Sequence, residues 1–169
     1  MEYGAKWMMY HPNAKGTGSS LQLELHPAHG HVEGSLFAKL APQKTVGSYG
    51  SGMRILPTFD WDGAITVRLD ILELAQIQEV LRGYREKIAD GNGLFHRTAK
   101  ANTVITFEHR IDPVPGYVLS MSQKSADGEL TRISFILSMT EALALSSALD
   151  GAIVHVAFGM PQFVREEVA

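Results

Sequence analysis

Three histidines lie close together in the sequence, and histidine is a common metal ligand. His26, His29 and His31 stand in the order His-Pro-Ala-His-Gly-His, and imidazoles at this spacing can bind zinc, copper or nickel. Pro27 and Gly30 favour a turn, however. We therefore expect the segment to form an exposed hairpin tip, and we predict neither a metal nor another cofactor.

Two other groups of polar residues lack the order that their chemistry requires. Residues 15–20, Lys-Gly-Thr-Gly-Ser-Ser, do not follow the Gly-x-x-x-x-Gly-Lys-Ser/Thr pattern of a phosphate loop, and no helix is expected after them. Asp60 and Asp62 flank a tryptophan and are expected to form a turn beside Gly63. The sequence contains no nucleophile elbow or other catalytic arrangement, so it predicts a protein that is not an enzyme.

Composition restricts the class of protein further. The 169 residues are 45% apolar and 20% charged and include no cysteine, which is typical of a folded domain without disulfides or zinc ribbons. The apolar stretches are interrupted before they reach the roughly 18–20 residues of a membrane span. Residues 1–10 lack the apolar core of a signal peptide. We expect an intracellular protein, cytoplasmic or nucleoid-associated, with no membrane partner.

The net charge of −3 argues against a polycation that coats nucleic acid. The charge is not evenly distributed, however. Residues 1–57 hold five basic and three acidic side chains and residues 94–132 hold five and four, whereas residues 58–93 hold four and seven and residues 133–169 one and four. Two mildly basic segments therefore alternate with two acidic ones.

In the first half, the spacing of apolar residues predicts strands followed by a helix. The expected strands are 21–25, 35–40 and 64–69. Residues 70–82 carry a helical apolar stripe. Asp70 is its expected N-cap, and Glu73 completes a capping box. Gly83 favours the end of the helix, although residues 84–89 could extend it. Residues 47–52, Gly-Ser-Tyr-Gly-Ser-Gly, are expected to form a flexible connection.

The second half repeats this order. The expected strands are 103–111, 117–122 and 131–137. Asp127-Gly128 predicts a hairpin turn between the last two strands. Ser138 and Glu141 predict a second capping box, which begins a helix that is expected to end at Gly151.

An offset of 68 residues aligns the two halves with five identities in 19 positions. The identical pairs are Ile65 and Ile133, Leu69 and Leu137, Glu73 and Glu141, Leu81 and Leu149, and Gly83 and Gly151. We interpret this as a structural duplication, with units at about 5–93 and 100–158 and a C-terminal tail at 159–169. Neither unit is expected to bury its sheet face alone, so the two should pack as one domain over 1–169.

The order of elements and three short motifs resemble the Whirly family. Phe-Asp-Trp at 59–61 resembles the family's aromatic-Asp-Trp entry into the strand before its first helix, and Leu-Phe-His at 94–96 resembles the apolar-Phe-His segment after that helix. Lys15-Gly16 followed by Leu21 is similar to the family's Lys-Gly-Lys-Ala-Ala-Leu block, with Thr17 in place of the second lysine. The resemblance spans roughly residues 7–158.

The resemblance implies an α+β fold of duplicated β-β-β-β-α units, in which two antiparallel four-stranded sheets pack on two helices. Whirly proteins are plant single-stranded-DNA-binding factors of transcription and genome maintenance, and mitochondrial guide-RNA-binding proteins share their fold. The implied function is binding of single-stranded DNA with little sequence specificity, in replication, recombination, repair or transcription regulation. The implied assembly is a homotetramer joined through the helices, with the strand of DNA running along the sheet faces.

Binding an unpaired strand requires cations for the phosphates and exposed rings for the bases. The strand-rich segments are the basic ones, which is consistent with binding on a sheet face. The candidate phosphate contacts are Lys15, Lys39, Lys44, Lys100 and Lys124. The candidate stacking residues are Trp7, Tyr10, Phe37 and Tyr117. Trp61 and Phe107 are expected to pack in the core instead.

Two alternatives stay open at the level of sequence. An RNA-binding protein of the same fold would present the same cations and rings. A non-catalytic assembly or scaffold protein that has lost nucleic-acid binding is favoured by the net charge and by Thr17.

Overall fold

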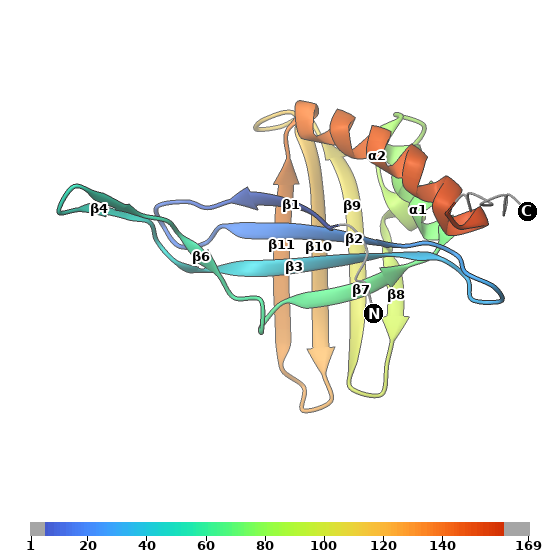
Figure 1. The fold of residues 1–169 in the computed structure, drawn as a ribbon, viewed down its shortest axis with the longest axis horizontal. Coiled ribbons are helices and arrows are strands. Elements are labelled where there is room, and N and C mark those ends of the chain that lie inside the picture. The colour runs from blue at the N-terminus through green and yellow to red at the C-terminus, as the bar shows by residue number, and fades with distance from the viewer. Residues whose placement is uncertain (1–5, 161–169) are drawn as a thin grey trace, which may run out of the picture.

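Two large antiparallel sheets, a separate two-stranded hairpin and two α-helices form the framework of residues 6–160, the part of the chain that this computed structural model describes (Figure 1). The first sheet has the order β1-β2-β3-β7, with the short β6 beside the end of β3, and the second has the order β11-β10-β9-β8. The strands are β1 Lys6–His11, β2 Ser19–His26, β3 Ser35–Thr45, β4 Ser48–Gly50, β5 Met53–Ile55, β6 Thr58–Phe59, β7 Ile65–Leu69, β8 Leu94–Arg97, β9 Ala101–Arg110, β10 Gly116–Ser125 and β11 Leu130–Leu137. The helices are α1 Ile71–Leu81, α2 Met139–Phe158 and the 3₁₀ turn Ile88–Gly91. The α+β class with antiparallel sheets is confirmed.

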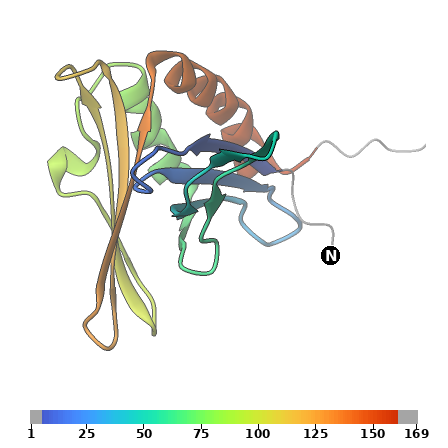
Figure 2. The same ribbon diagram turned by 90° about the vertical axis from the view of Figure 1, so that its left-hand side faces the viewer.

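One hydrophobic core joins both sheets to both helices. The strands of the first sheet run across those of the second in Figure 1, and α2 lies against both sheets (Figure 2). Side chains alternate between the two faces of a strand, so every second residue points inward. Large fully buried side chains from the strands are joined in the core by Leu74 of α1; those from the strands are Leu21, Leu40, Ile65, Ile105, Phe107, Met121, Phe135 and Leu137. Each sheet therefore has one face in the core and one face directed away from it.

Residues that are 68 positions apart contact each other where α1 meets α2. The amide nitrogen Nε2 of Gln78 donates to the carbonyl oxygen of Ser146 at 2.9 Å, and the Ser146 hydroxyl donates back to Oε1 of Gln78 at 2.9 Å. Arg82 and Asp150, which are also 68 apart, form an ion pair. In each pair the residue on α1 stands 68 positions before its partner on α2. The offset found in the sequence is thus the spacing of contacts across this helix pair.

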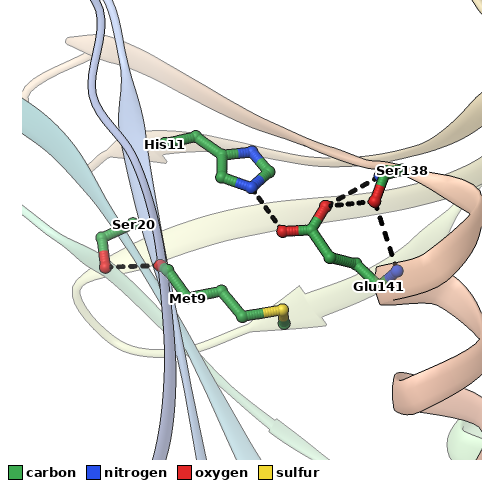
Figure 3. A network of polar contacts seen from close by, with 5 residues as sticks. All are labelled: Met9, His11, Ser20, Ser138 and Glu141. Carbon is green, nitrogen blue, oxygen red and sulfur yellow. Dashed lines mark hydrogen bonds and ion pairs between the residues drawn. The ribbon is translucent and has the colours of Figure 1, made fainter.

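Both predicted capping boxes are present. At the start of α2, the Ser138 hydroxyl accepts a hydrogen bond from the backbone nitrogen of Glu141, and the Glu141 carboxylate accepts one from the backbone nitrogen of Ser138 (Figure 3). Nε2 of His11 in β1 lies 2.6 Å from Oε1 of Glu141 (Figure 3). The Ser20 hydroxyl in the same sheet donates to the Met9 carbonyl at 2.9 Å. A strand of the first sheet therefore holds the start of the second helix.

The end predicted for the second helix was wrong, since α2 continues past Gly151 to Phe158. A glycine costs about 1 kcal/mol in a helix interior, and packing of the following turns compensates for this cost. Val156 is buried, and a Cβ on Gly34 would lie 2.6 Å from the Val156 carbonyl oxygen. The His155 carbonyl accepts hydrogen bonds from two backbone nitrogens, at 3.0 and 2.9 Å, one of them from the turn between β2 and β3. Of the predicted tail at 159–169, residues 161–169 lie outside the described part of the chain.

Helix α2 is more apolar than we expected from the sequence, which predicted no stretch long enough to span a membrane. The helix has 20 residues and is, by length and composition alone, apolar enough to cross a membrane. Core helices of water-soluble proteins pass the same test, and one side of α2 is part of the core described above. Other apolar side chains of the helix, among them Leu143 and Val154, are exposed, which leaves a surface for another contact.

Candidate nucleic-acid interface

The side of the first sheet that faces away from the core carries two rows of side chains in register. We call this side the outer face. Its first row is Lys6, Glu24, Phe37 and Arg68, and its second row is Met8, Gln22, Lys39 and Thr66. The strand register places these side chains next to one another, because cross-strand neighbours on one face are about 4.5–5.5 Å apart.

Lys39 and several aromatic rings lie on this outer face. The ammonium of Lys39 lies 5.7 Å from the centre of the Trp61 ring, which is a cation–π distance. Tyr10 is 51% exposed and its ring centre is 5.5 Å from that of Phe59. Phe37 is half-buried beside Lys39, two residues away on the same strand. The face thus combines a cation with several accessible rings.

A shallow hollow of about 280 Å³ lies in the middle of the outer face. It is lined by Lys6, Gln22, Glu24, His26, Phe37, Lys39 and Thr66. The Glu24 side chain is 11% exposed and is paired with Lys6 Nζ at 3.4 Å and His26 Nε2 at 3.0 Å. Within the described residues, Lys39 has no carboxylate partner. The one acidic group of the hollow is therefore neutralised, and the charge of Lys39 is not.

The structure brings three of the residues predicted for binding together on the outer face. Tyr10, Phe37 and Lys39 lie there, on β1 and β3. Sequence reasoning missed Phe59 and assigned Trp61 to packing, whereas the ring of Trp61 lies beside Lys39 and is half-buried. The Phe-Asp-Trp motif at 59–61 was the sequence signal that could have pointed to these two rings. Its position on the outer face follows from the pairing of β6 with β3, which no local sequence pattern predicts.

The other predicted lysines lie elsewhere on the surface. Lys100 and Lys124 line a second hollow, of about 170 Å³, with Arg97 at the hairpin ends of the second sheet. Lys15 is exposed in the turn between β1 and β2, and Lys44 is exposed near the end of β3.

Two predicted stacking residues face the core instead. Trp7 is half-buried on the inner side of β1 and lines an apolar hollow against α2. Tyr117 is 6% exposed, its ring centre is 5.7 Å from that of the buried Phe107, and its hydroxyl donates to the Leu81 carbonyl at 3.4 Å. Phe107 packs in the core, as expected. Trp7 and Tyr117 therefore do not contribute to the outer face.

The histidine segment forms a turn between β2 and β3. His29 and Val32 exchange backbone hydrogen bonds at 3.0 and 2.9 Å, which closes the turn. Nε2 of His26 lies within hydrogen-bonding distance of Oε1 of Glu24, at 3.0 Å. Among residues 6–160, no group of three His, Cys, Asp or Glu side chains is placed to hold a metal ion.

Two crossed antiparallel sheets, each followed by a helix, define the Whirly fold, and this chain has that fold. The structure of WHY3 from Arabidopsis thaliana matches it with a TM-score of 0.70 at 18% sequence identity, over 94% of this chain and 92% of that one. WHY1 from the same plant gives a TM-score of 0.69 at 18% identity, over 94% and 87%. The trypanosome proteins MRP1/MRP2 give 0.60 at 17% identity, over 89% and 84%. No protein-family model and no curated protein sequence matches the chain.

Proposed function

We propose that this protein binds single-stranded DNA through the outer face of its first sheet and catalyses no reaction. The observation that carries the proposal is the position of Lys39, which no described carboxylate pairs, beside the Trp61 ring and on the same face as Phe37 and Tyr10. Lysine neutralises a phosphate, and each ring can stack on a base for about 1–3 kcal/mol. Because every base has a π-face, such a surface binds with little sequence specificity.

The cellular role that this activity fits is intracellular maintenance or expression of DNA. A strand binder without sequence specificity protects or holds unpaired DNA in replication, recombination, repair or transcription regulation. A cytoplasmic or nucleoid-associated location follows from that role. The likeness to WHY1 and WHY3 in fold supports the proposal.

Association of several copies is part of the proposal. Exposed apolar side chains run along α2 and the start of α1; they are Leu72, Met139, Leu143, Val154 and Phe158. We infer that they are covered by further copies of this chain, in a homo-oligomer for which the resemblance favours a tetramer. Several copies would bring several outer faces to one strand, which raises the affinity without new contacts. This compensates for the net charge of −3.

A titration with labelled nucleic acids tests the proposal. Fluorescence anisotropy is measured with fluorescein-labelled oligothymidylate, oligouridylate and a DNA duplex over a series of salt concentrations. We expect the DNA strand to bind most tightly, and the logarithm of its affinity to fall linearly with the logarithm of the salt concentration. Tighter binding of oligouridylate would assign the outer face to RNA instead. Absence of binding to all three at low salt would refute the proposal and favour a scaffold.

A further inference from the structure

A separate hairpin extends past the end of the first sheet. Strands β4 and β5 pair only with each other, and their turn at Ser51 and Gly52 has positive φ at both residues, 54° and 75°. All six residues of the two strands are exposed. Figure 1 shows the hairpin projecting beyond the region where β3 pairs with β2. Our expectation of a flexible connection at 47–52 was wrong, because these residues form most of this hairpin.

The base of the hairpin is tied to the outer face. The Thr58 backbone nitrogen donates to the Thr45 hydroxyl oxygen at 3.0 Å, and the two threonine hydroxyls are 2.8 Å apart. Phe59 follows directly and contacts Tyr10 on the outer face. Gly47 lies where a Cβ would be 3.1 Å from the Ile55 carbonyl oxygen, so the two arms of the hairpin approach each other closely. The hairpin is therefore a continuation of the surface that carries Tyr10, Phe59 and Lys39.

One face of the hairpin carries an aromatic ring beside a guanidinium. Tyr49 and Arg54 are direct cross-strand partners, so their side chains lie on the same face. Tyr49 is 81% exposed, and among the described residues neither side chain has a hydrogen-bonding or ionic partner. Met53 and Ile55 lie on the opposite face, 71% and 59% exposed.

The charge around the hairpin favours a polyanion. Between Ser35 and Phe59 the sequence has Lys39, Lys44 and Arg54 and no carboxylate. This segment forms β3, the hairpin and β6, so its positive charge runs from the outer face onto the hairpin. An interface with an apolar protein surface would not require this positive charge, whereas the phosphate backbone of a nucleic acid complements it.

We propose that Tyr49 and Arg54 bind the same single strand as the outer face, Tyr49 by stacking on a base and Arg54 by contacting a phosphate. The inference rests on the proposed function, and it adds a second contact site next to the first. An isolated hairpin of two strands is marginally stable by itself, and a strand lying across it would hold it in place. A single strand would thus be bound over a longer track than the sheet alone offers.

Substitutions on the two faces of the hairpin test this proposal. Tyr49→Ala and Arg54→Ala are compared with Tyr49→Phe and with the control Met53→Ser/Ile55→Ser, using labelled oligothymidylate. We expect Tyr49→Ala to weaken binding about 5-fold or more and Tyr49→Phe to retain it. Arg54→Ala should also make the slope of log affinity against log salt shallower by about 0.7, whereas Tyr49→Ala should leave the slope unchanged.

The outcomes separate this inference from the proposed function. If Tyr49→Ala and Arg54→Ala bind as the parent does while Lys39→Ala binds less tightly, the hairpin contact is refuted and the outer-face site stands. If the parent protein binds no strand, both fail. A third outcome would overturn the inference. If Met53→Ser/Ile55→Ser lowers the mass measured by light scattering, and the Tyr49 and Arg54 variants bind the oligonucleotide as the parent does, the hairpin docks on a second copy of the chain. The substituted hairpin residues are all exposed, so the melting temperatures of the hairpin variants should match that of the parent.

Discussion

Nε2 of His96 lies 2.6 Å from Oε1 of Glu73, the residue that closes the capping box of α1. His11 and Glu141 repeat this contact at 2.6 Å at the start of α2. His96 belongs to the first strand of the second sheet, and His11 to the first strand of the first. Each sheet therefore holds the start of the helix that follows the other sheet.

The first prediction concerns acid. Burial alone would raise the pKa of Glu141, but hydrogen bonds from the backbone and hydroxyl of Ser138 and from His11 outweigh it and lower the pKa below its usual value of 4.5. A carboxyl with a lowered pKa stabilises the fold above the pKa of the unfolded chain, and this stabilisation is lost as the pH falls below 4.5 towards the folded value. We expect Glu141→Gln to be less stable than the parent at pH 7 and to lose less stability between pH 6 and about pH 3.5. Urea denaturation at several pH values measures this. Equal losses in both proteins would contradict the assignment.

The second prediction concerns the histidine in the same contact. His11 also stacks on the buried Phe135, with ring centres 4.3 Å apart and planes at 20°. Removing the imidazole in His11→Ala takes away both a hydrogen bond to a carboxylate and a ring contact, so we expect a loss of roughly 1–3 kcal/mol in the free energy of unfolding. His31→Ala, at an exposed position in a turn, is the control and should change the free energy little. Equal stability of the two variants in urea at pH 7 would contradict a structural role for His11.

The third prediction separates charge from stacking on the outer face. Lys39→Ala should lower the affinity for oligothymidylate and make its salt dependence shallower by about 0.7 in slope. Trp61→Ala should weaken binding about 5-fold or more, mainly through the lost ring. Lys87→Ala is the matched control, because Lys87 is paired with Glu108 at 3.5 Å and lies away from this face. A control variant that weakened binding as much as Lys39→Ala would locate the site elsewhere.

The fourth prediction concerns assembly. Leu143 and Val154 are 70% and 53% exposed on α2, and a glutamate at either position would place an unpaired charge in any interface built on this helix. We expect Leu143→Glu and Val154→Glu to reduce the mass measured by light scattering. Val114→Glu, at a position that is 73% exposed between β9 and β10, should not change it. If all three variants keep the parent mass, copies associate through another surface or not at all.

Much of the fold could be predicted from the sequence because its signals are local. Alternation of apolar residues placed β2, β3, β7, β9, β10 and β11, and the spacing Asp70 to Glu73 and Ser138 to Glu141 placed both helix starts. The end of α2 could not be predicted in this way, because its last turns are held by Gly34 and by the turn between β2 and β3. These contacts join segments more than a hundred residues apart in the sequence.

The outer face shows the same limit. Phe37 and Lys39 could be placed on one side of a strand because they are two residues apart. Trp61 lies beside Lys39 because β6, which follows the hairpin, pairs with β3. No local sequence pattern predicts this pairing. Tyr10 and Tyr117 could not be distinguished by residue type alone. Tyr10 is exposed, whereas Tyr117 lies on β10 in the middle of the second sheet and its side chain is buried.

The exchange of helix contacts between the two sheets has a consequence for folding cooperativity. A chain that had formed only β1 to α1 would lack His96 at its helix start and the second helix beside Gln78, and it would expose its inner sheet face to water. Neither half can then be a stable intermediate, since each is completed by the other. Thermal and urea unfolding should each show one transition that coincides between tryptophan fluorescence and circular dichroism, although the sequence predicts two similar units.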